Sequence, residues 1–255
     1  MQVAAQMYTV REFTKTPADL AKAYKKVADI GYKAVQPSGH GPIEAGELKK
    51  ALEDNGLNCC STHCSFQRFT EELDKLIADH KLWGCKYPAI GSLPGNMRSA
   101  EGFVEFAKMF DAIGAKLAAE GMFFLYHNHH HEFAKYGGKL GMDLIMDNSD
   151  PMHVGMEIDT HWVQAGGADP AAWIAKVAKR GPAPVIHFKD FTVDAETRER
   201  KFAEIGEGNL NWPAILEACR AANVEYVLVE QDTCDGDPFD SLKKSYENLC
   251  AMGLS

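Results

Sequence analysis

Residues 184–191 read PVIHFKDF, a short apolar strand that ends in polar side chains. Because side chains alternate along a strand, His187 and Lys189 share one face, and Ile186 and Phe188 share the other. In a barrel of parallel strands covered by helices, the apolar pair should face the helices and the polar pair the axis. This stretch therefore predicts a barrel strand that carries functional side chains at its carboxyl end.

Three other stretches have the same form, each with a residue that binds hard metal ions just past an apolar run. They are YHNHHHEF at 126–133, VGMEIDTHW at 154–162 and YVLVEQD at 226–232, and they supply Glu132, Asp159 and Glu230. Side chains at the ends of separate strands converge only if the strands lie side by side with their carboxyl ends together. With His187 they form a set that suits an octahedral divalent ion, with manganese preferred and magnesium, cobalt or zinc as alternatives.

The rest of the chain alternates between strand-like and helix-like segments. In the first helix-like segment Thr16 is the expected cap, Pro17 the first residue and Gly31 the end. Continuous alternation of this kind indicates a parallel sheet, and eight units without a linker favour a closed barrel. We therefore expect one α/β domain over residues 1–255, a single (β/α)8 TIM barrel, with strands at 3–10, 33–38, 57–63, 86–91, 122–128, 153–159, 183–190 and 226–232.

Several histidines follow predicted strand ends. His127 and His129 alternate onto one face at the end of a strand, whereas His130 and His131 fall in the following loop. His63 ends another strand and could reach across the mouth of a barrel. We expect His63, His127 and His129 to contact the substrate.

Two further residues near the ligand set have more than one interpretation. Glu157 shares a face with Asp159, which makes it either a rival ligand or a partner of Lys189. Trp162 could stack on a sugar face or pack in the interior. We expect Trp162 and Lys189 to complete the substrate-binding set.

Composition narrows the class of protein. The chain has 255 residues, 45% of them hydrophobic and 25% charged, and a net charge of −9 that disfavours nucleic acid as a partner. No signal peptide is evident after Met1, and apolar runs such as MFFLY are too short to span a membrane. Seven cysteines without a CxxC pair argue against a disulfide framework. We expect a cytoplasmic protein with no membrane partner, and the sequence leaves a homo-oligomer open.

The motifs HNHHHEF, EIDTHW, HFKD, GEGNLNW and VEQDTCDGDPFDSLKKSYENL, with QMYTVRE at the first strand, resemble the xylose-isomerase-like TIM-barrel superfamily. Within it they are most similar to bacterial proteins of the sugar phosphate isomerase/epimerase group, over essentially the whole chain. The resemblance implies a divalent metal held by Glu132, Asp159, His187 and Glu230. In related ketose 3-epimerases the two glutamates are also the acid/base pair. Those enzymes carry a substrate-binding histidine where this chain has Trp162, and an arginine after the strand-seven histidine that has no match here.

The site and the resemblance together predict a metal-dependent isomerase or epimerase that acts on a sugar or keto-sugar derivative. The metal would hold a carbonyl and a neighbouring hydroxyl, and Glu132 and Glu230 would move protons on the two faces of a metal-bound enediolate. The alternative is a lyase, inosose dehydratase-like or keto-glycoside-cleaving, that uses the same site. Phosphodiester cleavage, as in the apurinic endonucleases of the superfamily, is disfavoured by the net charge of −9. A barrel that binds a sugar without turning it over is the non-enzymatic alternative.

Overall fold

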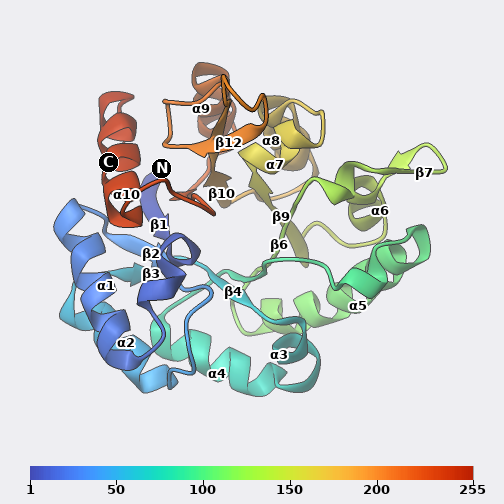
Figure 1. Cartoon of the computed structure of the whole chain (residues 1–255). Coiled ribbons are helices and arrows are strands. Elements are labelled where there is room, and N and C mark those ends of the chain that lie inside the picture. Colours follow the sequence, from blue (N-terminus) through green and yellow to red (C-terminus); the bar gives the residue numbers. More distant parts are fainter. Residues whose placement is uncertain (255) are drawn as a thin grey trace.

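The computed structural model describes residues 1–254, in which parallel strands run side by side around a common axis (Figure 1). The strand order in this sheet is β3-β2-β1-β13-β10-β9-β6-β5-β4. Every neighbouring pair in it is parallel. The strands are β1 (Gln2–Gln6), β2 (Ala34–Gln36), β3 (Asn58–Cys59), β4 (Thr62–Cys64), β5 (Pro88–Ile90), β6 (Phe124–His127), β9 (Val154–Asp159), β10 (Val185–Phe188) and β13 (Tyr226–Val229).

The sheet closes within the predicted strand at 57–63. This stretch forms two consecutive segments, β3 and β4, interrupted at Cys60 and Ser61. Because β3 pairs with β2 and β4 pairs with β5, the chain itself joins the two ends of the sheet. The backbone N–H of His63 also donates to the carbonyl of Pro37, just past β2, at 3.1 Å. The nine segments thus fill eight strand positions, and the predicted (β/α)8 barrel is confirmed.

The helices surround the strands in a ring (Figure 1). Helix α1 begins and ends as expected, because the Thr16 side chain accepts a hydrogen bond from the Asp19 N–H at 3.2 Å and Gly31 closes the helix with a φ of 130°. None of the helices in the described residues is both long enough and apolar enough to cross a membrane. The helices are α1 (Pro17–Ile30), α2 (Ala45–Asp54), α3 (Phe66–Glu71), α4 (Leu73–Trp83), α5 (Ala100–Ala119), α6 (Gly141–Asp147), α7 (Thr160–Ala165), α8 (Pro170–Arg180), α9 (Trp212–Ala221) and α10 (Pro238–Ala251), with 3-10 turns η1 (Met7–Phe13), η2 (Gly95–Met97) and η3 (His131–Phe133).

The two faces of the strands differ in chemistry. On the outer face Phe188 packs edge-on against Trp212 of α9, with ring centroids 5.0 Å apart, which confirms the predicted orientation of this strand. A separate apolar cluster contains Ala4, Ala34, Leu125, Val185 and Leu228. Two residues further along the same strands, and therefore on the same face, stand Gln6, Gln36, His127, His187 and Glu230. The barrel interior thus has an apolar lower layer and a polar upper layer at the carboxyl ends of the strands.

Two long loops at the carboxyl end of the barrel contain short antiparallel hairpins. The loop after Phe133 holds β7 (Lys135–Tyr136) and β8 (Lys139–Leu140), and the loop after Phe188 holds β11 (Asp190–Val193) and β12 (Arg200–Ala203). Pairing within each loop gives backbone groups the partners that an open loop would lack. Both hairpins rise from the carboxyl end of the barrel.

A single buried carboxylate fixes the base of the second hairpin. Asp190 is fully buried, and a Cβ at Gly208 would lie only 2.2 Å from Asp190 Oδ1, so the backbone must pass very close to it. The Asp190 carboxylate accepts hydrogen bonds from Trp212 Nε1 (2.6 Å) and from the backbone N–H groups of Phe191 (2.8 Å), Gly206 (3.0 Å), Gly208 (3.2 Å) and Leu210 (3.3 Å).

Replacing Asp190 by Ala should therefore lower the free energy of unfolding by about 3 kcal/mol or more, because several buried N–H groups lose their acceptor at about 1–3 kcal/mol each. Urea denaturation followed by circular dichroism measures the change. Asp194→Ala is the matched control, since Asp194 also accepts backbone N–H groups, but at the surface. Equal destabilisation by the two substitutions would contradict the role given to Asp190.

Candidate active site

The carboxyl ends of the barrel strands surround a cavity of about 500 Å³. Its walls come from loops and strand ends that are far apart in the sequence. Of the residues predicted to form the site, His63, His127, His129, Lys189 and Glu230 line it. Tyr8, Arg11, Ser38 and Asp232, which were not predicted, line it as well.

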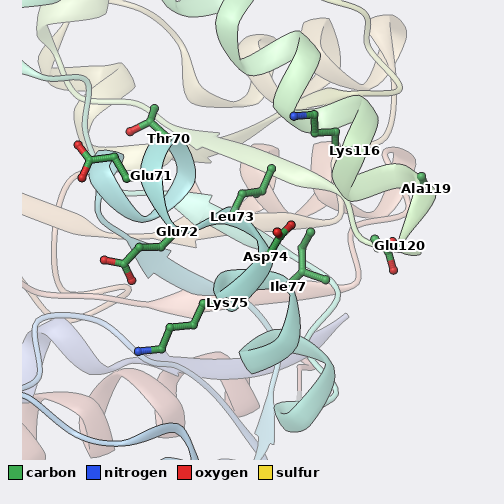
Figure 2. Close-up of a pocket in the computed structure, with 10 residues that line it drawn as sticks. All are labelled: Thr70, Glu71, Glu72, Leu73, Asp74, Lys75, Ile77, Lys116, Ala119 and Glu120. Atoms are coloured by element: carbon green, nitrogen blue, oxygen red, sulfur yellow. The ribbon is translucent and has the colours of Figure 1, made fainter.

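A second hollow, of about 690 Å³, lies on the outside of the barrel (Figure 2). It is bounded by the junction of α3 and α4 and by the end of α5, with Glu71, Asp74 and Lys116 among the side chains around it. None of the predicted site residues lines it. The cavity at the barrel mouth is the candidate active site, because titratable groups from several strands converge there.

Four buried side chains at the mouth could hold one metal ion. One ligand atom from each of His127, Asp159, His187 and Glu230 lies within 4.8 Å of the others. His187 Nδ1 is 2.8 Å from Glu230 Oε2, and His127 Nε2 is 3.8 Å from Asp159 Oδ2. The structure thus brings together three of the four predicted ligands, and the fourth member is His127, which was expected to bind substrate. We call this set the His187 group.

Glu132 is the predicted ligand and acid/base residue that the structure does not bring to the His187 group. Strand β6 ends at His127, and Glu132 lies five residues later in the turn η3. There the Tyr126 hydroxyl donates to Glu132 Oε1 at 2.5 Å, and the backbone N–H of His129 donates to Oε2 at 2.9 Å. In the cluster that the structure forms, His127 therefore stands where the sequence predicted Glu132.

Glu157 lies beneath the mouth, fully buried between two imidazoles. Its Oε2 is 2.7 Å from His63 Nε2 and 3.2 Å from His187 Nε2, and Gln36 donates to its Oε1 at 2.8 Å. Burial raises the pKa of Glu157, but His187 and His63 outweigh burial and lower that pKa to about 2. Glu157 therefore carries a negative charge that orients both imidazoles, and it remains a rival ligand in a group with His63, His127 and His187.

Lys189 contacts three carboxylates, and Glu157 is not one of them. Its Nζ lies 2.7 Å from Asp232 Oδ1, 3.3 Å from Glu230 Oε2 and 3.6 Å from Asp159 Oδ2. Burial lowers the pKa of Lys189, but Glu230 and Asp159 outweigh burial and raise it. The predicted alternative of a Lys189–Glu157 pair is thus wrong. Asp232 was not predicted, although its position two residues after Glu230 was a usable signal.

The residues at the mouth fit a divalent cation on two counts. Four buried or partly buried carboxylates share the mouth with three cationic groups, Lys189, His187 and Arg11, which leaves an excess of negative charge. Burial raises the pKa of Asp159 to about 7. Burial lowers the pKa of His187, but Glu157 and Glu230 outweigh it and raise that pKa to about 10. In addition, two buried atoms of the His187 group, His127 Nδ1 and Asp159 Oδ2, have no hydrogen-bond partner in the described residues. A bound ion would remove the energetic cost of leaving them unpaired.

The remaining predicted substrate contacts differ in placement. His63 lines the cavity, and its ring stacks on His187 at a centroid distance of 5.2 Å. Trp162 is absent from the residues that line the cavity; its backbone N–H donates to Asp159 Oδ1 at 2.9 Å, and its ring lies 5.3 Å from that of His129. Trp162 therefore helps to fix Asp159, and its ring packs against His129 and Lys189, which line the cavity.

The chain matches the family described as "Xylose isomerase-like TIM barrel" over residues 24–251. The protein belongs to this family. The resemblance expected from the sequence motifs is thereby confirmed, and membership of the xylose isomerase-like family indicates an enzyme. No curated protein matches the chain.

Several solved structures have a similar fold. A sugar phosphate isomerase/epimerase from Parabacteroides distasonis ATCC 8503 is 24% identical, with a TM-score of 0.78 over 98% of this chain and 97% of that one. A D-allulose 3-epimerase from Methylomonas sp. is 14% identical, with a TM-score of 0.76 over 98% and 96%. A probable 3-DHS dehydratase from Bacillus anthracis is 14% identical, with a TM-score of 0.71 over 98% and 99%. These similarities establish the shared fold.

Proposed function

We propose that the protein is a metal-dependent isomerase or epimerase of a sugar or keto-sugar derivative. The observation that carries this proposal is the convergence of His127, Asp159, His187 and Glu230 beside the mouth cavity. Their mixed nitrogen and oxygen donors suit manganese, with magnesium, cobalt or zinc as alternatives. Family membership and the names of the isomerase/epimerase and D-allulose 3-epimerase structures supply the substrate class.

The metal would be held by the His187 group. When bound, such an ion polarises a substrate carbonyl and makes the adjacent C–H bond more acidic. The protein's own contribution is the placement of a base and of hydrogen-bond donors around that carbon.

Glu230 is the proposed base. Burial raises the pKa of this carboxyl, but Lys189 and His187 outweigh burial and lower it, so Glu230 is ionised at neutral pH. It lines the cavity, where a substrate C–H could approach it. Lys189, 3.3 Å from Glu230, could donate a hydrogen bond to a substrate oxygen that gains negative charge. His63 and His129 line the same cavity and could bind hydroxyl groups.

The position of Glu132 bears on the stereochemistry. The Glu132 carboxylate accepts hydrogen bonds from the Tyr126 hydroxyl and the backbone N–H of His129, and we assign it no role in moving a substrate proton. A single base returns the proton on the face from which it was taken, which suits isomerisation between adjacent carbons. Epimerisation at one carbon requires a second proton donor on the opposite face.

Proton exchange in heavy water tests the proposal. The manganese-loaded protein is incubated with ketoses, keto-glycosides and inososes, and the products are followed by NMR and mass spectrometry. Incorporation of solvent deuterium with the mass otherwise unchanged is expected. Loss of water or of an aglycone would instead identify the lyase, and no exchange with any compound would overturn the proposed function.

A further inference from the structure

The loop after β6 gathers three more side chains of the kind that bind metals. One nitrogen of His129, one nitrogen of His131 and one oxygen of Glu132 lie within 4.8 Å of one another. The two imidazole rings are stacked, with centroids 5.6 Å apart and planes 20° apart, and His131 Nε2 lies 3.1 Å from Glu132 Oε1. None of the three residues belongs to the His187 group. Within the stretch 129–132, two nitrogens and one oxygen therefore converge at a point separate from that group.

The ligand atoms of this loop are held in position, and one of them lacks a partner. His129 Nδ1 is buried without a hydrogen-bond partner in the described part of the chain, whereas His131 Nε2 has the Glu132 carboxylate beside it at 3.1 Å. Buried polar atoms normally find a partner, so the His129 nitrogen calls for an explanation. Glu132 is fully buried, and the Tyr126 hydroxyl and the His129 N–H each bond to one of its oxygens. Such outer hydrogen bonds are what orients a metal-binding carboxylate.

We propose that His129, His131 and Glu132 form a second metal site, for a first-row transition ion such as zinc, cobalt or iron. Two imidazoles and one carboxylate are a known ligand set for such ions, and they leave coordination positions open. His129 also lines the mouth cavity, so the proposed site lies at the edge of the candidate active site. The inference goes beyond the proposed function, because it concerns a second ion whatever reaction the first one supports.

Metal stoichiometry of the full chain tests this site. The protein is stripped with a chelator, dialysed against zinc or cobalt, and analysed by elemental mass spectrometry and by cobalt absorption. We expect about two ions per chain in the native protein and about one in His131→Ala. His187→Ala should retain about one ion, and the double variant should retain none. Because the readout is bound metal, failure of this inference is separable from failure of the proposed isomerase, which the exchange assay reports.

His130→Ala is the matched control, since His130 neighbours His131 in the same loop but is not one of the three ligand residues. It should keep about two ions. If His130→Ala and His131→Ala lose the same amount of metal, the histidine-rich loop captures metal non-specifically and the site is overturned. A single ion per chain in the native protein would overturn it as well. Glu132→Gln, which keeps an acceptor for Tyr126, is a second variant in case His131→Ala fails to fold, and it too should lose one ion.

Discussion

Replacing Glu230 by Gln should lower kcat by about 10,000-fold while leaving the fold intact. General base catalysis supplies about 100- to 10,000-fold, and the upper end applies because Glu230 would also ligate the metal. Gln has the same size and can still accept the hydrogen bond that His187 Nδ1 makes with Glu230 Oε2 at 2.8 Å. It cannot take a proton at neutral pH, and it removes the charge that faces Lys189 at 3.3 Å. Steady-state kinetics on the compound found by deuterium exchange, with circular dichroism for the fold, measure the effect.

Glu225→Gln is the matched control for this experiment. Glu225 directly precedes β13, the strand that Glu230 follows, but it is exposed and accepts a hydrogen bond from the Tyr87 hydroxyl at 2.7 Å. It lies at the amino end of the strand, far from the mouth, so this variant should turn over substrate at the native rate. Near-native activity in Glu230→Gln itself would refute the assignment of Glu230 as the base.

Site residues within a strand or directly after it could be placed from the sequence, whereas those further along a loop could not. Asp159 is the last residue of β9, His187 lies within β10, and Glu230 follows β13 directly. Strand alternation fixes the direction of such side chains, so closure of the barrel is enough to bring them together. Glu132 lies five residues past β6, where the 3-10 turn η3 sets its direction, and no periodicity in the sequence reports that turn.

Contacts between side chains on opposite sides of the barrel could not be predicted from the sequence either. Glu157 and His63 are 94 positions apart and meet at 2.7 Å because β9 and β4 face each other across the closed sheet. Alternation predicted that Glu157 and Asp159 share a face, but it could not choose between a ligand and a partner of Lys189. That choice depends on side-chain reach, and Lys189 reaches Asp232 instead. The eight strand–helix units, by contrast, were predictable because each repeats a local pattern with its own start and stop signals.

Removal of the divalent ion should abolish turnover and lower the melting temperature of the protein. Without an ion, the carboxylates of Asp159, Glu157 and Glu230 repel one another in a buried space, and the ligand atoms His127 Nδ1 and Asp159 Oδ2 stay unpaired. An ion that binds only the folded state stabilises it by RT ln(1 + [L]/Kd), which is about 2.7 kcal/mol at a hundred times Kd. Activity and thermal unfolding after dialysis against a chelator, with and without added manganese, measure both effects.

Asp159→Asn should remove most of the rise in melting temperature that manganese causes, because it deletes one charged ligand from the His187 group. Asp235→Asn, at an exposed ion pair with Lys201, should keep the full rise. Repeating the titration in His131→Ala assigns the response to the His187 group and not to the loop after β6. The proposal is contradicted if the chelated protein keeps full activity and manganese changes the melting temperature of none of these proteins. The four converging side chains would then form a buried hydrogen-bond network without a metal, and metal-assisted proton transfer would have no basis.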